Sequence, residues 1–131
     1  MRDPRYDILF APVKIGPVTA KNRFFQVPHC NVLGHARPYA EAANRGIKAE
    51  GGWGVICNQE TEIHPSSEIS PYIEGRIWDD QDIPQHRLMT DALHEYGARS
   101  FVETRTGTVR TGHHVFLART GAAHFLLQLC L

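Results

Sequence analysis

Residues 53–58 read Trp-Gly-Val-Ile-Cys-Asn, and this short apolar run decides the fold when it is taken with two similar runs. The others are Arg-Phe-Phe-Gln-Val-Pro at residues 23–28 and Ser-Phe-Val-Glu at residues 100–103. Apolar runs of this length are typical of strands that are buried on both faces of a parallel sheet. Pro28 is expected to end the first strand, because proline cannot donate a hydrogen bond to the ladder.

Two segments with helical periodicity separate these strands. Between residues 38 and 50, apolar side chains at positions 40, 43, 47 and 49 recur at roughly helical spacing, and Gly51-Gly52 provides a stop. Asp82 and Gln85 have the spacing of a capping box at the start of a second helix, which Gly97 ends. One face of this helix is apolar and holds Leu88, Met89, Ala92, Leu93 and Tyr96. The order strand, helix, strand, helix, strand predicts right-handed parallel crossovers and an α/β fold.

The two ends of the chain carry different signals. Near the start, short apolar runs flank the turn dipeptide Gly16-Pro17, which predicts a small β-hairpin. All 14 acidic residues and all 8 prolines lie in residues 1–103. Residues 104–131 hold three arginines, three histidines and no acid. We therefore divide the chain into residues 1–103 and an aberrant tail, 104–131.

Composition and charge argue against several kinds of partner. Among 131 residues, 14 are basic and 14 acidic, so bulk charge favours neither nucleic acid nor an anionic membrane. No run of about 18 apolar residues is present, and the charges within residues 1–7 do not suit a signal peptide. We expect a cytoplasmic protein without a membrane span. Cys30, Cys57 and Cys130 form no CxxC pair and are expected to be reduced thiols.

Several motifs resemble, in order, those of one protein family. They are Arg2-Asp3-Pro4, Asp7-Ile8-Leu9-Phe10, Ile15-Gly16-Pro17, Asn22-Arg23-Phe24, Gln26-Val27-Pro28-His29-Cys30, Lys48-Ala49-Glu50-Gly51-Gly52-Trp53, Glu62-Ile63-His64-Pro65 and Arg76-Ile77-Trp78-Asp79. Across residues 1–103 the chain is similar to the start of the trimethylamine, dimethylamine and histamine dehydrogenases, a branch of the old yellow enzyme class of FMN proteins. The resemblance implies a (β/α)₈ barrel with FMN at the carboxyl ends of its strands. Because such a barrel needs about 250 residues, we expect an incomplete TIM barrel, its first three strands preceded by the hairpin.

The resemblance also implies which residues contact the flavin. Cys30 matches the cysteine whose sulfur is bonded to carbon 6 of FMN, a bond that requires a thiolate near the electron-poor ring. Backbone groups of Val27, Pro28 and His29 would lie against the pyrimidine and central rings. Glu103 matches a carboxylate or amide that accepts hydrogen bonds from flavin ring N–H groups. From the residues alone, Cys30 could instead be a small buried hydrophobe and Glu103 a solvated carboxylate.

The expected substrate site departs from the family pattern. Relatives usually carry a glutamate followed by an aromatic residue or glutamine, where this chain reads Gln59-Glu60. An aromatic ring would hold an alkylammonium ion by cation–π attraction. Glu60 offers a full negative charge, which favours an amine with N–H donors, or it is a solvated loop residue. The amine therefore stays open.

The resemblance implies a reaction in which a small amine reduces FMN, and the electrons then pass singly to a [4Fe–4S] centre and on to an acceptor. In the full-length family this protein would be a homodimer. Neither a cluster-binding cysteine motif nor GxGxxG is present, and no catalytic residue is assigned, so the fragment is expected to be inactive alone. The alternatives are an ene-reductase of the same class, which takes hydride from NAD(P)H, and a non-catalytic gene remnant.

The tail lacks the glycine-rich, Ala-Pro-Asn and Ser-Arg motifs that the family carries after the third strand. We interpret residues 104–131 as the product of a reading-frame error or a gene remnant, a hypothesis that translation of the coding DNA in its other frames would test. His113, His114 and His124 match no standard metal-ligand spacing, so no metal site is expected.

Overall fold

A parallel sheet forms the centre of the protein in the computed structural model, which describes residues 3–65, 72–105, 114–118 and 125–127. Its parallel strands are β3 (Phe25–Gln26), β4 (Val55–Glu62) and β6 (Arg99–Arg105), in that spatial order. Phe25 pairs with Val55, and Val55 pairs with Arg99. The short β5 (Gly75–Arg76) adds to the far end of β4 in parallel. This arrangement confirms the predicted α/β fold.

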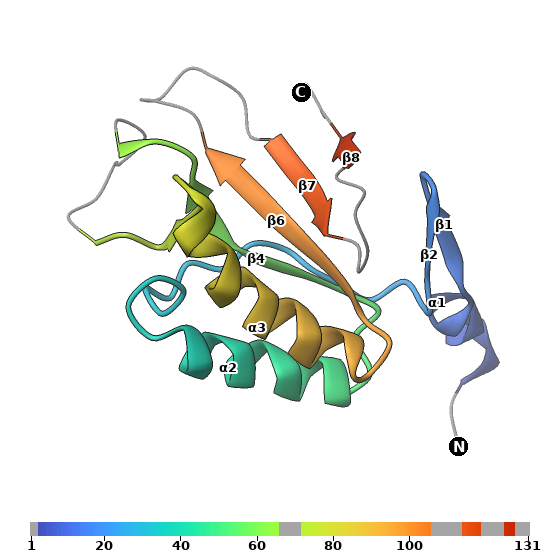
Figure 1. Ribbon diagram of the computed structural model, residues 1–131. Coiled ribbons are helices and arrows are strands. Elements are labelled where there is room, and N and C mark those ends of the chain that lie inside the picture. Colours follow the sequence, from blue (N-terminus) through green and yellow to red (C-terminus); the bar gives the residue numbers. More distant parts are fainter. Residues whose placement is uncertain (1–2, 66–71, 106–113, 119–124, 128–131) are drawn as a thin grey trace.

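Two helices, α2 (Pro38–Glu50) and α3 (Ile83–His94), lie side by side against one face of the sheet (Figure 1). The bounds of α2 match the prediction. At the amino-terminal end, η1 (Pro4–Tyr6) and α1 (Asp7–Phe10) precede the expected hairpin of β1 (Val13–Ile15) and β2 (Val18–Ala20), whose turn residue Gly16 has φ of 54°. No helix in the described ranges combines the length and apolarity needed to cross a membrane.

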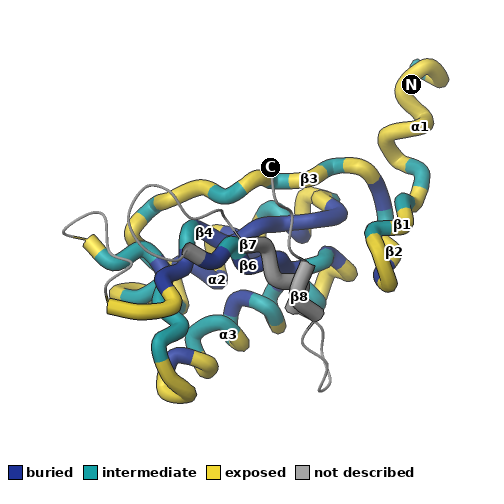
Figure 2. The backbone as a smooth tube through the Cα atoms, turned by 90° about the horizontal axis from the view of Figure 1, so that it is seen from above, coloured by how far each residue is buried: buried dark blue, intermediate teal, exposed yellow. Residues whose placement is uncertain are grey.

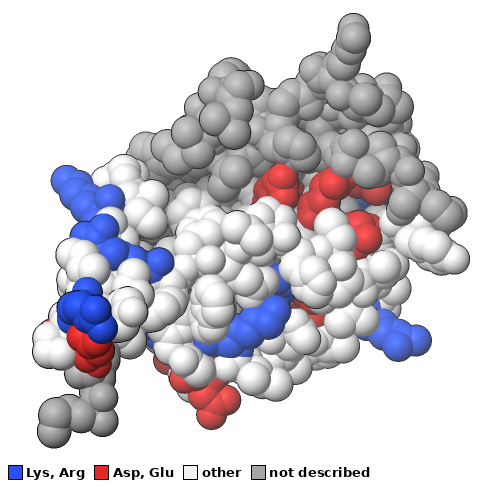
Figure 3. Space-filling view, turned by 180° about the vertical axis from the view of Figure 1, so that it is seen from behind, with Lys and Arg blue, Asp and Glu red and all other residues white. Residues whose placement is uncertain are grey.

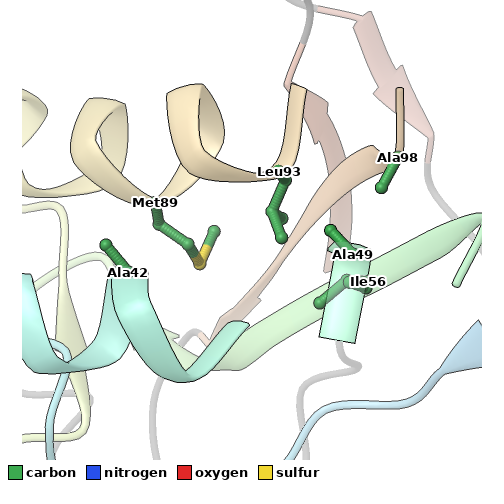
Figure 4. Packing of buried hydrophobic residues seen from close by; sticks show 6 residues of the cluster. All are labelled: Ala42, Ala49, Ile56, Met89, Leu93 and Ala98. Atoms are coloured by element: carbon green, nitrogen blue, oxygen red, sulfur yellow. The ribbon is translucent and has the colours of Figure 1, made fainter. Parts of the chain in front are cut away.

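Successive residues of β4 supply the two hydrophobic clusters of the core, one on each face of the sheet. Ile56 points toward the helices and packs with Met89 and Leu93 of α3, as Figure 4 shows. On the opposite face, Val55 and Cys57 pack with other side chains, including Phe101. The second cluster places Cys57 inside the core, where its thiol behaves as a small hydrophobe.

Of the apolar positions predicted for α2, Ala49 is buried in the core, but the other three are exposed. Ala40 and Ala43 are exposed, and Ile47 is 67% exposed. The buried side instead carries an oppositely charged pair, Glu41 and Arg45, together with small residues. Glu41 and Arg45 neutralise each other's charge, so these two polar residues can occupy buried positions of the helix. A prediction from apolar periodicity places charged residues on the solvent-exposed face instead.

The first strand is shorter and more open than predicted. Only Phe25–Gln26 pairs with β4, and Phe25 is 44% exposed. Figure 2 shows β4 as a buried strand, whereas the chain around β3 is half-buried or exposed. Within the described sheet β3 is the edge strand, so its outer side has no neighbouring strand to cover it.

The capping box lies three residues before the predicted one. The side chain of Asp79 accepts a hydrogen bond from the Gln81 N–H, and Asp79 and Asp82 form the box around the 3₁₀ turn η3 (Asp80–Asp82). The carboxylate of Asp82 also receives hydrogen bonds from Arg76 at 2.8 Å and from Gln85 at 3.3 Å. Asp82 therefore joins β5 to α3, while Gly97, with φ of 69°, follows the helix as predicted.

The backbone after β6 departs from the order of a (β/α)₈ barrel. β7 (His114–Ala118) runs antiparallel to β6, and β8 (Phe125–Leu127) runs antiparallel to β7. A barrel strand is instead followed by a helix and then by another parallel strand. The reading-frame interpretation of this tail stays a prediction.

Candidate functional site

Three residues from separate parts of the sequence come together where the parallel strands end. Glu60 of β4 and Glu103 of β6 are direct partners in the strand register. Cys30 follows β3 and interacts with both carboxylates as well as with Glu74. Figure 3 shows acidic side chains gathering on one part of the rear surface. The strand order thus brings together the predicted residues Cys30, Glu60 and Glu103.

A register irregularity in β4 sets the direction of Glu60. Cys57 pairs with Phe101, but Glu60, three residues later, pairs with Glu103, only two residues later in β6. The additional residue is typical of a β-bulge, which redirects the side chains beyond it. Without the bulge, Cys57 and Glu60 would point to opposite faces, because side chains alternate along a strand.

The Cys30 thiol is exposed, so the alternative of a buried hydrophobe does not hold. Partial desolvation raises the pKa of Cys30 above its ordinary value, and the negative charges of Glu74, Glu60 and Glu103 raise it further. A hydrogen bond with the backbone of Glu60 acts in the opposite direction. The surroundings therefore favour a neutral thiol near pH 7, whereas the flavin bond would require a thiolate.

The residues on both sides of Cys30 are tied to helix α2. Nη2 of Arg45 donates to the carbonyl oxygen of His29 at 2.6 Å, and Nδ2 of Asn31 donates to Oε2 of Glu41 at 2.6 Å. Arg45 and Glu41 form an ion pair with each other, also at 2.6 Å. These contacts hold the segment that carries the thiol against the buried side of the helix.

The next residues form a constrained turn. Val32 has φ of 59°, a left-handed conformation that is rare for a β-branched residue. Its N–H donates to Oε2 of Glu74 at 2.8 Å, and the N–H of Leu33 donates to Oδ1 of Asn31 at 3.1 Å. A left-handed non-glycine residue costs about 1–3 kcal/mol, so surrounding contacts must hold it in place.

The other predicted flavin contacts lie in the segment between β3 and Cys30. Val27 is 64% exposed, Pro28 is half-buried and His29 is exposed. Two of the three residues before Cys30 are thus exposed, although the carbonyl oxygen of His29 is bonded to Arg45. The exposure of this segment contrasts with that of Ile56 in the neighbouring strand, which is fully buried.

Glu103 is half-buried, and its charge and its backbone both act on the Cys57 thiol. Burial, and then the negative charge of Glu103, raise the pKa of Cys57 to about 12, despite opposing hydrogen bonds from the backbone and the charge of Arg45. The rings of Phe25 and Phe101 pack edge to face nearby, with centroids 5.8 Å apart. The base of the site is therefore apolar, and its rim is acidic.

Sequence reasoning missed Glu74, Glu41 and Arg45. Glu74 also accepts, through its carbonyl oxygen, a 2.6 Å hydrogen bond from Nε2 of the buried Gln59. No sequence signal places Glu74 beside Cys30, because the contact spans more than forty positions of the chain. For Glu41 and Arg45, the signal was the i, i+4 spacing of opposite charges in a helix.

No group of three or more His, Cys, Asp or Glu residues within the described part of the chain could hold a metal ion. The histidines at positions 113, 114 and 124 lie outside the residues whose side chains are described.

The chain is similar to one protein family and to several known proteins. The model of the NADH:flavin oxidoreductase / NADH oxidase family matches residues 8–115. Dimethylamine dehydrogenase from Hyphomicrobium sp. (strain x) is 50% identical over 97 residues, which are 74% of this chain and 13% of that protein. An NADPH dehydrogenase from Listeria welshimeri serovar 6b is 30% identical over 100 residues, or 72% of this chain and 29% of that enzyme.

Among solved structures, histamine dehydrogenase from Rhizobium sp. 4-9 is similar with a TM-score of 0.73 and 58% sequence identity. The match covers 76% of this chain and 14% of that protein. The chain thus spans only a small part of the relatives that it matches. Together with the described sheet, the match confirms an incomplete (β/α)₈ barrel that consists of its first three strands and the preceding hairpin.

Proposed function

The chain belongs to the NADH:flavin oxidoreductase / NADH oxidase family, and we propose that it is the amino-terminal part of an FMN-dependent amine dehydrogenase. The observation that carries this proposal is the meeting of Cys30, Glu60 and Glu103 at the strand ends. The similarity also favours an amine dehydrogenase, since identity is 50% to dimethylamine dehydrogenase and 30% to an NADPH dehydrogenase.

The residues at the strand ends fit the ring system of FMN. An isoalloxazine needs an apolar surface beneath it and acceptors for its ring N–H groups. Val27, an apolar residue in the segment leading to Cys30, is 64% exposed. Glu103 would accept from a ring N–H, and the exposed Cys30 thiol would lie at the ring edge.

The same residues do not suit the phosphate of FMN. Glu60, Glu74 and Glu103 all act on Cys30, so a phosphate group there would meet repulsion. In TIM barrels the phosphate is frequently bound by the loops after strands seven and eight. We therefore assign only the ring part of the cofactor site to this chain.

The proposed reaction is the oxidation of a small amine, in which FMN supplies the two-electron acceptor. Glu60 would bind and orient the substrate ammonium group by its charge, and Glu103 would orient the ring through a hydrogen bond. Cys30 would fix the cofactor covalently. The iron–sulfur centre, the electron acceptor and the proton-handling groups would belong to sequence outside this chain.

Mass spectrometry of the full-length protein after denaturation tests the covalent link. We expect an FMN adduct on the tryptic peptide that contains Cys30, its absence from the Cys30→Ser variant, and its retention in Cys57→Ala. Flavin that is released completely on denaturation would contradict the amine dehydrogenase proposal. It would favour an ene-reductase, for which the raised pKa of Cys30 also argues because a neutral thiol is a poor nucleophile.

The assignment of the ring site alone has its own test. Riboflavin shares the isoalloxazine of FMN but lacks the phosphate, so the 131-residue chain should bind riboflavin at least as tightly as FMN. Quenching of flavin fluorescence measures both affinities. Markedly tighter binding of FMN would show that the chain holds the phosphate as well.

We also propose that the fragment does not turn over alone, that the full-length protein is a cytoplasmic homodimer, and that residues 104–131 arise from a shifted reading frame. The antiparallel course of β7 and β8 supports the last proposal, because the family fold requires a helix there. Recovery of the missing family motifs in another frame of the coding DNA is the expected result.

A further inference from the structure

Helix α2 contains an ion pair that is almost completely removed from solvent. Nε of Arg45 lies 2.6 Å from Oε1 of Glu41, and the two side chains are 0% and 4% exposed. Burying two charges carries a desolvation penalty that their attraction does not reliably repay. Such a pair is therefore a weak source of stability, and its other contacts indicate a different role.

Both members of the pair reach the segment that carries Cys30. The second nitrogen of the Arg45 guanidinium donates to the carbonyl oxygen of His29, and the second oxygen of Glu41 accepts from Asn31, both at 2.6 Å. These are the residues immediately before and after Cys30. The planar, forked guanidinium suits this arrangement because it can bond a carboxylate and a carbonyl simultaneously.

We propose that Glu41 and Arg45 are positioning residues, which fix Cys30 at the strand ends by clamping the residues on each side of it. The benefit to flavin attachment rests on the proposed function, whereas the placement of the thiol can be measured without flavin. Neither side chain is assigned contact with the cofactor or substrate, so their effect is exerted through the segment 29–31.

The turn beyond Cys30 shows why a clamp is needed. Val32 occupies an unfavourable left-handed conformation, and its N–H is directed to Glu74, which itself acts electrostatically on the thiol. The N–H of Leu33 is bonded to Asn31, the residue held by Glu41. Release of the clamp should therefore free the Val32 and Leu33 amides before it affects the strands.

Amide-resolved hydrogen exchange on the 131-residue chain tests the proposal. Arg45→Lys retains a positive charge four residues from Glu41, but a lysine cannot bond Glu41 and His29 with a rigid fork. We expect exchange to rise about 10- to 100-fold at the Val32 amide, which is bonded to the Glu74 carboxylate, and about 3- to 10-fold at the Leu33 amide, which is bonded to the neutral side chain of Asn31. The amide of Ile56 in β4 should keep its protection.

Two further variants keep the test decisive. The double variant Glu41→Gln/Arg45→Met removes both charges, and so avoids an unpaired buried ion if a single substitution prevents folding. It should show the same local rise. Arg87→Met is the matched control, because Arg87 and Asp91 form an i, i+4 pair on α3 with side chains 79% and 60% exposed. Exchange at Val32 and Leu33 should not change in this control.

Unchanged exchange at Val32 and Leu33 in a folded variant would overturn the proposal. An equal rise at Ile56 would also overturn it, because the pair would then support the whole fold rather than the Cys30 segment. A full-length wild-type protein without an FMN adduct, together with the expected exchange results, would refute the flavin proposal and leave the clamp intact.

Discussion

Ionisation of the buried Cys57 thiol is expected to lower the stability of the fold at alkaline pH. The thiol is 1% exposed, and burial followed by the charge of Glu103 raises its pKa from 9.0 to about 12. Below pH 9 the thiol is neutral in the folded and unfolded chains and does not affect stability. Between pH 9 and 12 the unfolded chain loses this proton while the folded chain retains it, so stability falls as pH rises.

The expected loss follows from the size of the shift. One pKa unit corresponds to about 1.36 kcal/mol, so three units give about 4 kcal/mol at full effect. About two thirds of that, ~2.7 kcal/mol, should be lost by pH 11. Against a typical domain stability of about 5–15 kcal/mol, this change is readily measured.

Urea unfolding of the wild type and the Cys57→Ala variant isolates this contribution, because all other titrating groups are common to both chains. At pH 8 the variant should be less stable by about 1 kcal/mol, the cost of removing one small buried group. At pH 11 it should be more stable than the wild type, so the difference changes sign near pH 10. A difference that stays constant between pH 8 and 11 would refute the reasoning and show that the folded protein solvates this thiol.

Other changes test the site and its support. Glu74→Gln should accelerate alkylation of Cys30 by iodoacetamide at pH 8, measured by peptide mass spectrometry, because loss of the carboxylate charge lowers the pKa of the thiol; an equal or slower rate would contradict the electrostatic assignment. Leu93→Ala should destabilise the chain by about 2–5 kcal/mol in urea unfolding, since Leu93 is fully buried between the helices and the sheet. Gly97→Ala should cost about 1–2 kcal/mol because Gly97 has φ of 69°. By contrast, Gly46→Ala should stabilise α2 by about 0.5–1 kcal/mol, as its added methyl would lie 3.6 Å from the nearest atom; thermal melts that rank these two variants in the opposite order would exclude this account.

Sequence patterns predicted the positions of the main elements because their signals are local. Pro38 and Gly51 bound α2, and the apolar runs mark β4 and β6. The extension of β4 to Glu62 was not predicted, since its second half is polar, and the side chains of Asn58 and Gln59 bond to His86 and Glu74 of other segments. Apolar periodicity carries no information about such partners.

The candidate site was predicted only in part. Cys30, Glu60 and Glu103 follow or lie in successive parallel strands, so their convergence follows from the fold. The acidic surroundings of Cys30 depend also on Glu74, which arrives through a long-range contact. The sequence-based expectation of a thiolate at Cys30 did not include the negative charge of Glu74, which raises the pKa of the thiol.

The negative potential at the strand ends has consequences that differ for each expected ligand. It attracts an alkylammonium substrate, but it opposes both a Cys30 thiolate and a flavin phosphate. A site that accommodates all three must hold the phosphate away from these acids and place a positive group near the thiol. The acidic strand ends suit an amine, but by themselves they meet neither of these conditions. We therefore expect flavin attachment at Cys30 in the complete barrel, whose remaining loops would supply a positive charge near the thiol.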